Sequence, residues 1–578
     1  MKYILKYVKP CAGMIVLSML LKLTGTMMEL MIPYVMEHIL DSVAPTHSLS
    51  AVLLWGVGMI LLAIVTRFFN VTANRSAIRS SRKVGYEVRR DLFARSITLS
   101  GEQTDSVTLP SLTSRMTSDT YNIQNIVQRL QTIGIRAPIM LVGGIAVTLS
   151  MDTGLASILC IMAPIMILVV VFVSRKGIPL YDKVQQGVDD IVRVMRENIT
   201  GIRVVKALSR EKHEMDRFNT INEEMAQRET KAGIVMALPG PLITFALNIG
   251  LIIVVLVGAQ RVNDGVTQPG VILAFLTYFN MILTSVMALN RVFMMLSKAN
   301  ASANRIAEVL ALEDELSAVP EEQAAHTDRD GFLVFDHVSF SYGREKANED
   351  RRMALKNIDF SIPKGGSLGI IGPTGCGKTT IINLLMRFYD ATEGAVFVDG
   401  RDVRTYDIDE LRRKFGVVLQ NDVLFADSLR ENLSFGRDVD DAGLEKAAEE
   451  AQAIGFIRHY PEGFDRAVDI RGANYSGGQK QRLLISRALA GNHEVLILDD
   501  SSSALDYRTD AALRQAIAKG HRDITMVVVA QRISSIMNMD HILVLDEGAI
   551  LGQGTHEELM ASCPAYREIY QTQMGEVK

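Results

Sequence analysis

The chain has 578 residues, a formal net charge of −4 and 48% hydrophobic residues. This length is too great for a single hydrophobic core, so we expect two or more domains. The slightly acidic balance argues against nucleic acid as the main partner, and four cysteines without paired spacing exclude a disulfide framework or a zinc site.

Residues 1–310 predict a membrane domain. Four stretches contain no Asp, Glu, Lys or Arg, namely residues 42–66, 153–173, 232–260 and 265–290. Each exceeds the roughly 18 residues that indicate a membrane-spanning helix. Two further apolar segments carry isolated charges. We therefore expect six spans, at about residues 12–36, 51–73, 130–151, 153–175, 234–260 and 268–292.

The charge of the connections predicts the orientation of these spans. Residues 67–130 and 174–233 are rich in Arg and Lys, whereas the short connections hold one basic residue, Arg261. The excess of positive charge predicts that both long connections and both chain ends lie in the cytoplasm. We expect the membrane to be the cell membrane of a bacterial-type cell. Few Pro or Gly residues interrupt the long connections, so we expect the helices to continue well beyond the bilayer. The first apolar segment is too long for a cleavable signal peptide.

Residues 311–330, "ALEDELSAVPEEQAAHTDRD", form an acidic linker that marks the domain boundary. Residues 331–578 then follow a pattern of strand, Gly-rich turn, helix and further short strands. The predicted fold is a polytopic α-helical membrane domain followed by an α/β P-loop ATPase domain.

"GPTGCGKTT" matches the phosphate-binding pattern G-x-x-x-x-G-K-[ST], between the apolar strand "SLGII" and a helix. Backbone N–H groups and the helix N-terminus in such a turn surround phosphate oxygens. Lys378 is expected to reach the β- and γ-phosphates of ATP and Thr379 to ligate Mg²⁺. The expected nucleotide contacts here are Gly372, Thr374, Gly375, Cys376, Gly377, Lys378, Thr379 and Thr380.

"VLILDDSSSALD", residues 495–506, predicts a buried strand that carries two carboxylates to the phosphate site. Asp499 is the expected second metal ligand, and Asp500 stands where a carboxylate must reach the attacking water.

"NYSGGQKQRLLISRAL", residues 474–489, resembles the signature sequence of ABC transporters and lies just upstream of the acidic strand. With six spans ahead of one nucleotide-binding domain, the whole chain resembles a half-transporter of the ABC exporter type. The resemblance implies that Tyr342 stacks on adenine and that Gln420 senses Mg²⁺ and the γ-phosphate. Residues 114–124 and 197–218 resemble the cytoplasmic coupling regions of the family.

In the family, two ATPase domains hold two ATP molecules head to tail. The resemblance therefore implies that one group of residues contacts the ATP on the partner's P-loop, namely Ser476, Gly477, Gly478 and Gln479. These residues open a helix, so hydroxyl, N–H groups and helix dipole can meet a γ-phosphate.

Four positions depart from the family pattern. Asp500 replaces a glutamate and is one methylene shorter, and Gln531 replaces a switch histidine whose charge it cannot carry. Ile470 stands where a glutamate is usual, and Tyr475 replaces a leucine of the signature. Two changes in one hydrolytic site resemble the degenerate subunit of a heterodimeric exporter.

The sequence leaves several functions open. The favoured hypothesis is export of amphipathic small molecules by a heterodimer with a second, non-identical half-transporter. Alternatives are a homodimeric exporter of lipid or peptide, and an ATP-gated regulatory subunit that does not pump. Polar residues within the spans are the candidate substrate pathway, alongside contact with membrane lipid. They are Lys22, Glu29, Asn248, Asn280 and Asn290.

Overall fold

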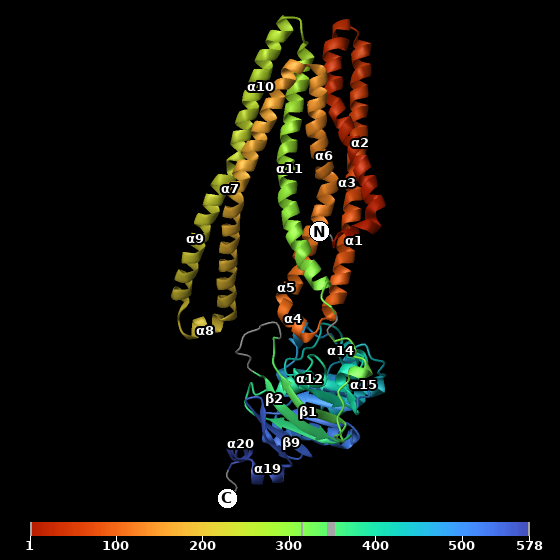
Figure 1. Ribbon diagram of the computed structural model, residues 1–578, viewed down its shortest axis with the longest axis vertical. Helices are drawn as coiled ribbons and strands as arrows, with labels where there is room; N and C mark the ends of the chain where they lie inside the picture. The colour runs from red at the N-terminus through yellow and green to blue at the C-terminus, as the bar shows by residue number, and fades with distance from the viewer. Residues whose placement is uncertain (1–2, 314–315, 344–352, 576–578) are drawn as a thin grey trace. The chain divides into compact units, whose positions relative to one another are not determined.

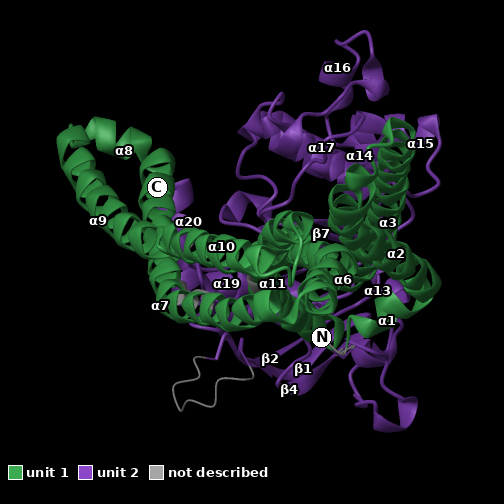
Figure 2. Ribbon diagram, turned by 90° about the horizontal axis from the view of Figure 1, so that it is seen from above, with its two compact units in different colours: residues 1–97, 109–311 green, residues 98–108, 312–578 purple. Residues whose placement is uncertain are grey.

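The computed structural model describes residues 3–313, 316–343 and 353–575, without the side chains at 170, 174, 178, 239 and 290. It divides into two compact units, coloured separately in Figure 2. Unit 1 comprises residues 1–97 and 109–311, and unit 2 comprises residues 98–108 and 312–578. A short segment between two membrane helices thus belongs to the same unit as residues 312–578.

Unit 1 is entirely helical in its described residues. Its helices are α1 (Leu5–Val8), α2 (Ala12–His38), α3 (Leu49–Ile97), α5 (Leu109–Ser114), α6 (Thr120–Met151), α7 (Thr153–Thr200), α8 (Ile202–Ala207), α9 (Glu211–Ala237), α10 (Pro239–Asn263) and α11 (Pro269–Leu310). Six stretches are long and apolar enough to cross a membrane, namely Leu5–Thr46, Leu49–Ile97, Leu109–Met151, Thr153–Thr200, Glu211–Asn263 and Pro269–Leu310. The predicted set of six long membrane helices is confirmed.

The spanning helices are much longer than a bilayer requires. Helix α3 has 49 residues and α7 has 48. At about 1.5 Å per residue each is roughly 70 Å long, more than twice the ~30 Å hydrocarbon core. The short helix α8 joins the far ends of α7 and α9, which lie side by side (Figure 1). The expectation that helices continue through residues 67–130 and 174–233 therefore holds over most of both ranges, with breaks at the short helices.

Polar side chains on one membrane helix form hydrogen bonds with backbone groups of another. The carboxylate of Asp41 accepts hydrogen bonds from the backbone N–H groups of Gly270 and Val271, at 2.7 and 3.1 Å. These N–H groups open α11 and have no partner within the helix, so Asp41 caps it. Tyr278, fully buried, donates to the Leu30 carbonyl at 2.6 Å. Both contacts join α11 to the first spanning segment.

Unit 2 contains two sheets. The first has the order β2-β1-β4-β5 and is antiparallel, with β1 (Leu333–Phe340), β2 (Leu355–Ile362), β4 (Glu393–Val398) and β5 (Arg401–Asp402). The second has the order β10-β9-β3-β8-β7-β6, with β3 (Ser367–Ile371), β6 (Phe415–Val418), β7 (Val495–Asp499), β8 (Thr525–Val529), β9 (His541–Asp546) and β10 (Ala549–Gly554). Only β10 pairs antiparallel in this second sheet.

Parallel strands need long crossover connections, which are usually helical. The further helices of unit 2 are α12 (Lys378–Leu385), α13 (Ile408–Arg413), α14 (Leu429–Ser434), α15 (Asp441–Glu450), α16 (Ile454–Ile457), α17 (Gly477–Leu489), α18 (Tyr507–Gly520), α19 (His556–Ser562) and α20 (Pro564–Met574). Of these, α12, α13, α17 and α19 pack against strands of the second sheet, and α14 and α15 pack against α17. Every residue of β7 is buried, which explains why this strand reads as a continuous apolar run. The carboxyl ends of β3 and β7 therefore bring the Gly-rich turn and the two aspartates to the same edge. The predicted α/β fold is confirmed.

Candidate functional site

The Gly-rich turn after β3 has a backbone that only glycine tolerates. Gly372 has φ +156°, and a Cβ there would lie 2.1 Å from the Leu545 carbonyl oxygen. The turn ends at Gly377, which precedes the first residue of α12, Lys378. The N–H groups at this helix start have no intrahelical partner, so they can bind an anion.

Lys378 is held by the turn itself. Its Nζ donates to the carbonyl oxygens of Gly372 and Pro373, at 2.8 and 2.7 Å. These two contacts hold the ammonium group above the turn, where a phosphate would be its stronger partner. Cys376 is buried with its Sγ 3.9 Å from the same Nζ, so its side chain fills the underside of the turn.

Asp499, at the end of β7, contacts the start of α12. Thr379 donates a hydrogen bond from its hydroxyl to Asp499 Oδ2 at 3.0 Å. Burial raises the pKa of Asp499, and the neighbouring charge of Asp500 adds to this effect, while the hydrogen bond from Thr379 opposes it. A hydroxyl and a buried carboxylate are oxygen ligands of the kind that Mg²⁺ prefers, so this pair fits that ion.

Asp500 and Gln531, two of the four positions that depart from the family pattern, contact each other. Gln531 donates from Nε2 to Asp500 Oδ2 at 2.9 Å. Asp500 has a left-handed backbone with φ +51°. Burial raises its pKa, and the hydrogen bond from Gln531 opposes that rise. A carboxylate held on one side in this way keeps its other oxygen available for a water molecule.

Tyr342 is 44% exposed and lies over the P-loop helix. Its hydroxyl is 3.0 Å from the Thr380 hydroxyl, and its ring meets the ring of Tyr389 edge to face at 5.2 Å. A half-exposed ring whose hydroxyl is fixed can present its face to a planar ligand.

These groups surround one cavity of about 950 Å³. The expected site residues that line it are Tyr342, Thr374, Gly375, Gly377, Lys378, Thr379, Thr380, Gln420, Asp499, Asp500 and Gln531. They converge from five separate sequence segments, and the cavity has room for a nucleotide and side chains that suit its phosphates.

The signature residues do not line this cavity. Ser476 caps α17 through a capping box: its hydroxyl accepts from Gln479 N–H at 3.3 Å, and Gln479 Oε1 accepts from Ser476 N–H at 3.0 Å. Ser476 and Gly477 are exposed, as is Ile470 at 76%. Tyr475 is buried, and its ring packs against Phe456 and Arg466.

Helix α4 (Gly101–Val107) packs against the ATPase fold within unit 2. Tyr389, four residues after the end of α12, donates to Asp105 at 2.7 Å, and a Cβ at Gly101 would meet its ring at 2.6 Å. Residues 114–124 and 197–218, the two regions expected to couple the domains, belong to unit 1. The sequence signal for α4 is its capping box, Ser100 with Gln103.

Comparisons with known proteins agree with this geometry. The family model "ABC transporter transmembrane region" matches residues 15–286, and the model "ABC transporter" matches residues 355–503. The uncharacterized ABC transporter ATP-binding protein YfiB of Bacillus subtilis is 32% identical over 579 residues, covering 100% of this chain and 99% of the relative. This chain belongs to the ABC transporter family.

Other relatives of this transporter are similarly distant. The uncharacterized ABC transporter ATP-binding protein Rv1273c of Mycobacterium tuberculosis is 32% identical and covers 98% of this chain and 97% of the relative. The ATP-dependent lipid A-core flippase of Syntrophus aciditrophicus is 32% identical over 81% of this chain and 76% of the relative.

A solved structure, a bacterial Atm1-family ABC exporter with ATP bound, has the same fold, with a TM-score of 0.80, 24% identity and 99% coverage of both chains. This likeness shows an exporter fold, and the family matches show that the chain is an ATP-hydrolysing transporter.

The membrane domain of the transporter contains a cluster of charged and amide side chains. Lys22 is 6% exposed, and its Nζ donates to Asn70 at 2.7 Å and Asn74 at 3.4 Å. Arg136 forms two hydrogen bonds with the Glu29 carboxylate, at 2.8 and 3.3 Å. The amide and arginine partners were missed in the sequence because they lie on other helices, α3 and α6.

The three expected pathway asparagines are less informative. Asn248 and Asn280 are exposed, and Asn280 donates to the Leu276 carbonyl of its own helix at 3.0 Å. The Asn290 side chain lies outside the described residues.

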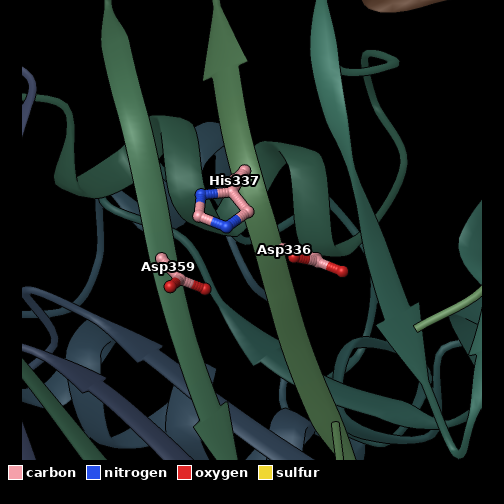
Figure 3. A group of neighbouring side chains, drawn as sticks. All are labelled: Asp336, His337 and Asp359. Atoms are coloured by element: carbon pink, nitrogen blue, oxygen red, sulfur yellow. The ribbon is translucent and has the colours of Figure 1, made fainter. Parts of the chain in front are cut away.

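Asp336, His337 and Asp359 form the group of metal-ligating side chains found among the described residues of the transporter (Figure 3). Arg329 pairs with both carboxylates, and His337 Nδ1 is 2.8 Å from the Asn357 side-chain oxygen. The arginine already supplies the positive charge that these carboxylates require, so the group fits an ion pair better than a metal.

Proposed function

We propose that this chain is one half of a heterodimeric ABC exporter that moves amphipathic small molecules out of the cell. The ATPase domain and both chain ends lie in the cytoplasm, as the positive charge of the long connections favours. The chain binds ATP at its own P-loop, hydrolyses it slowly there, and supplies Ser476, Gly477, Gly478 and Gln479 to the partner's faster site.

The contact between Gln531 and Asp500 carries this proposal. Aspartate is one methylene shorter than the glutamate of the family pattern, and a misplacement of about 1 Å can lower a rate by ~10²-fold. Gln531 donates a hydrogen bond but brings no positive charge. Both changes therefore weaken the same step, polarisation of the water that attacks the γ-phosphate.

The remaining residues of the cavity suit ATP binding. Lys378 exchanges its two backbone carbonyl partners for phosphate oxygens, and Tyr342 offers its ring to adenine. Thr379, Asp499 and Gln420 would hold Mg²⁺, whose charge offsets that of the phosphates. The exposed Ser476 and its helix N-terminus suit the γ-phosphate of a nucleotide on another chain, since they lie outside this chain's own cavity.

The decisive experiment uses the purified full-length chain without a partner. Fluorescent ATP should bind in the presence of Mg²⁺, while steady-state ATP turnover stays close to the background of a Lys378→Ala control. Turnover at the rate of an active transporter, from a verified homodimer, contradicts the heterodimer proposal.

A homodimeric lipid exporter is the second candidate. The observation that favours it is the identity with proteins named lipid A-core flippases, in Syntrophus and in Desulfotalea, over about four fifths of this chain. ATPase activity of the homodimer that rises with added lipid would select this function. ATP-dependent opening without transport would select the third candidate, a regulatory subunit.

A further inference from the structure

The C-terminal helix α20 contacts the loop that carries Gln531. Gln573, in the last turn of α20, accepts a hydrogen bond from Ile533 N–H through Oε1 at 2.7 Å. Its Nε2 donates to the Gln531 backbone carbonyl at 2.8 Å. The side-chain amide of Gln573 thus binds the Gln531 carbonyl and the Ile533 N–H, the backbone groups on either side of Arg532. A residue of a neighbouring parallel strand would bind the same two groups.

The packing of α20 fixes the position of Gln573. Tyr566 is fully buried, with its hydroxyl 2.8 Å from His556 Nδ1, and Ile569 packs against the same core. Gln573 follows Ile569 by four residues and Tyr566 by seven, so it lies on the same face of the helix. Its side chain is exposed, beyond the packed part of that face, and there it meets the backbone of the loop.

The loop has contacts on its other side as well. Arg514 donates to the Ser534 carbonyl, and Arg532 lies over the Tyr507 ring at 4.5 Å. Ile533 is fully buried. Between these contacts the backbone carbonyl of Gln531 is bound by Gln573, while the Gln531 side chain reaches Asp500.

We propose that Gln573 is a positioning residue for the loop at residues 531–535, and through it for the side chain at 531 beside Asp500. The amide acts on the backbone of residue 531, so it positions a glutamine or a histidine there equally. Its removal leaves the Ile533 N–H and the Gln531 carbonyl without these partners, and the loop is then free to shift. A shift of about 1 Å at such a site can lower the rate by ~10²-fold.

Amide hydrogen exchange tests the contact directly in the full-length transporter. We expect Gln573→Ala to raise the exchange rate of Ile533 about 10-fold, because its hydrogen-bond acceptor is lost. Gln573→Glu keeps the acceptor but not the donor, so exchange should rise less. Gln571→Ala is the matched control, because Gln571 is an exposed glutamine on the same helix and its substitution should leave the loop unchanged.

ATP turnover tests the consequence for the site. This arm rests on the proposed function, under which D500E/Q531H restores hydrolysis at this chain's own P-loop. In that background, Gln573→Ala should lower the added turnover about 10-fold and leave the KM for ATP within about twofold. Gln571→Ala should preserve both values.

The outcomes separate the two proposals. If the Gln573→Ala chain exchanges the Ile533 amide hydrogen at the parent's rate, the positioning role is overturned. It is also overturned if exchange rises but Gln573→Ala leaves the ATP turnover gained by D500E/Q531H undiminished. If D500E/Q531H adds no turnover, the slow-site proposal fails, while the exchange rates still decide whether Gln573 positions the loop.

Discussion

Gln531 donates a hydrogen bond to Asp500 at 2.9 Å, which joins two of the four residues that depart from the family pattern. The pair lies beside a P-loop whose glycines, lysine and threonine match the pattern fully. A domain that had lost its function as a whole would show changes throughout the cavity. Among the residues that line the cavity, the differences lie at the two positions proposed to act on water, so we expect ATP binding and ATP hydrolysis to be separable in this chain.

Lys378→Ala should weaken binding of Mg-ATP to this chain. The substitution removes a charge-assisted contact worth about 1.5–3 kcal/mol, or roughly 10- to 100-fold in affinity. Titration with a fluorescent ATP analogue measures the effect. Lys446→Ala, at a side chain that is 66% exposed on α15, is the control and should bind as the parent does. Equal affinity in the two variants contradicts the role of the P-loop.

Tyr389→Phe should weaken communication between α4 and the nucleotide cavity. The variant keeps the ring that touches Tyr342 and Gly101 but loses the hydrogen bond to Asp105. We expect unchanged affinity for ATP and reduced stimulation of ATPase activity by transport substrates. Asp105→Asn keeps an acceptor oxygen, so its effect should be smaller. Full stimulation in both variants would show that this hydrogen bond does not transmit the signal.

The sequence predicts the parts of this site that depend on local patterns. Uncharged runs identify the spans, and the spacing of glycine, lysine and threonine identifies the P-loop, because a continuous stretch of backbone makes each of them. Tyr389 and Asp105 are 284 residues apart, and no spacing rule connects them. The coupling role that the family resemblance implies for residues 114–124 also depends on a contact that the sequence does not display, and it stays a prediction.

Glu29→Gln should change which charged compounds stimulate the assembled transporter. Glu29 is paired with Arg136, so removing its charge leaves an unpaired arginine within the membrane domain. We expect weaker stimulation by cationic compounds and stronger stimulation by anionic ones, measured as dose-response curves of ATPase activity. Arg136→Gln should shift the curves in the opposite direction. Curves that match the parent for every compound would assign the pair a purely structural role.

We expect two residues of this one ATPase domain, Ser476 and Asp500, to serve different ATP molecules. Ser476 lies outside this chain's own cavity and is proposed to serve the partner's ATP, whereas Asp500 lines the cavity. Removing one oriented donor from a transition-state site lowers the rate roughly 10²- to 10³-fold. Ser476→Ala should therefore abolish most ATPase activity of the co-expressed pair.

Asp500→Asn should lower that activity far less, because the slow site contributes little of the total turnover. The amide still fits beside Gln531, so binding of ATP should persist. Steady-state ATPase assays on the assembled pair compare the two variants, and Lys446→Ala is the control. Asp506→Asn is unsuitable as a control, because the Asp506 carboxylate caps α18 by accepting a hydrogen bond from Thr509 N–H. A severe loss of activity from Asp500→Asn, together with a mild loss from Ser476→Ala, would refute the assignment of the slow site to this chain. Asp500 would then activate water at a fast site in this chain, and the signature residue Ser476 would be dispensable.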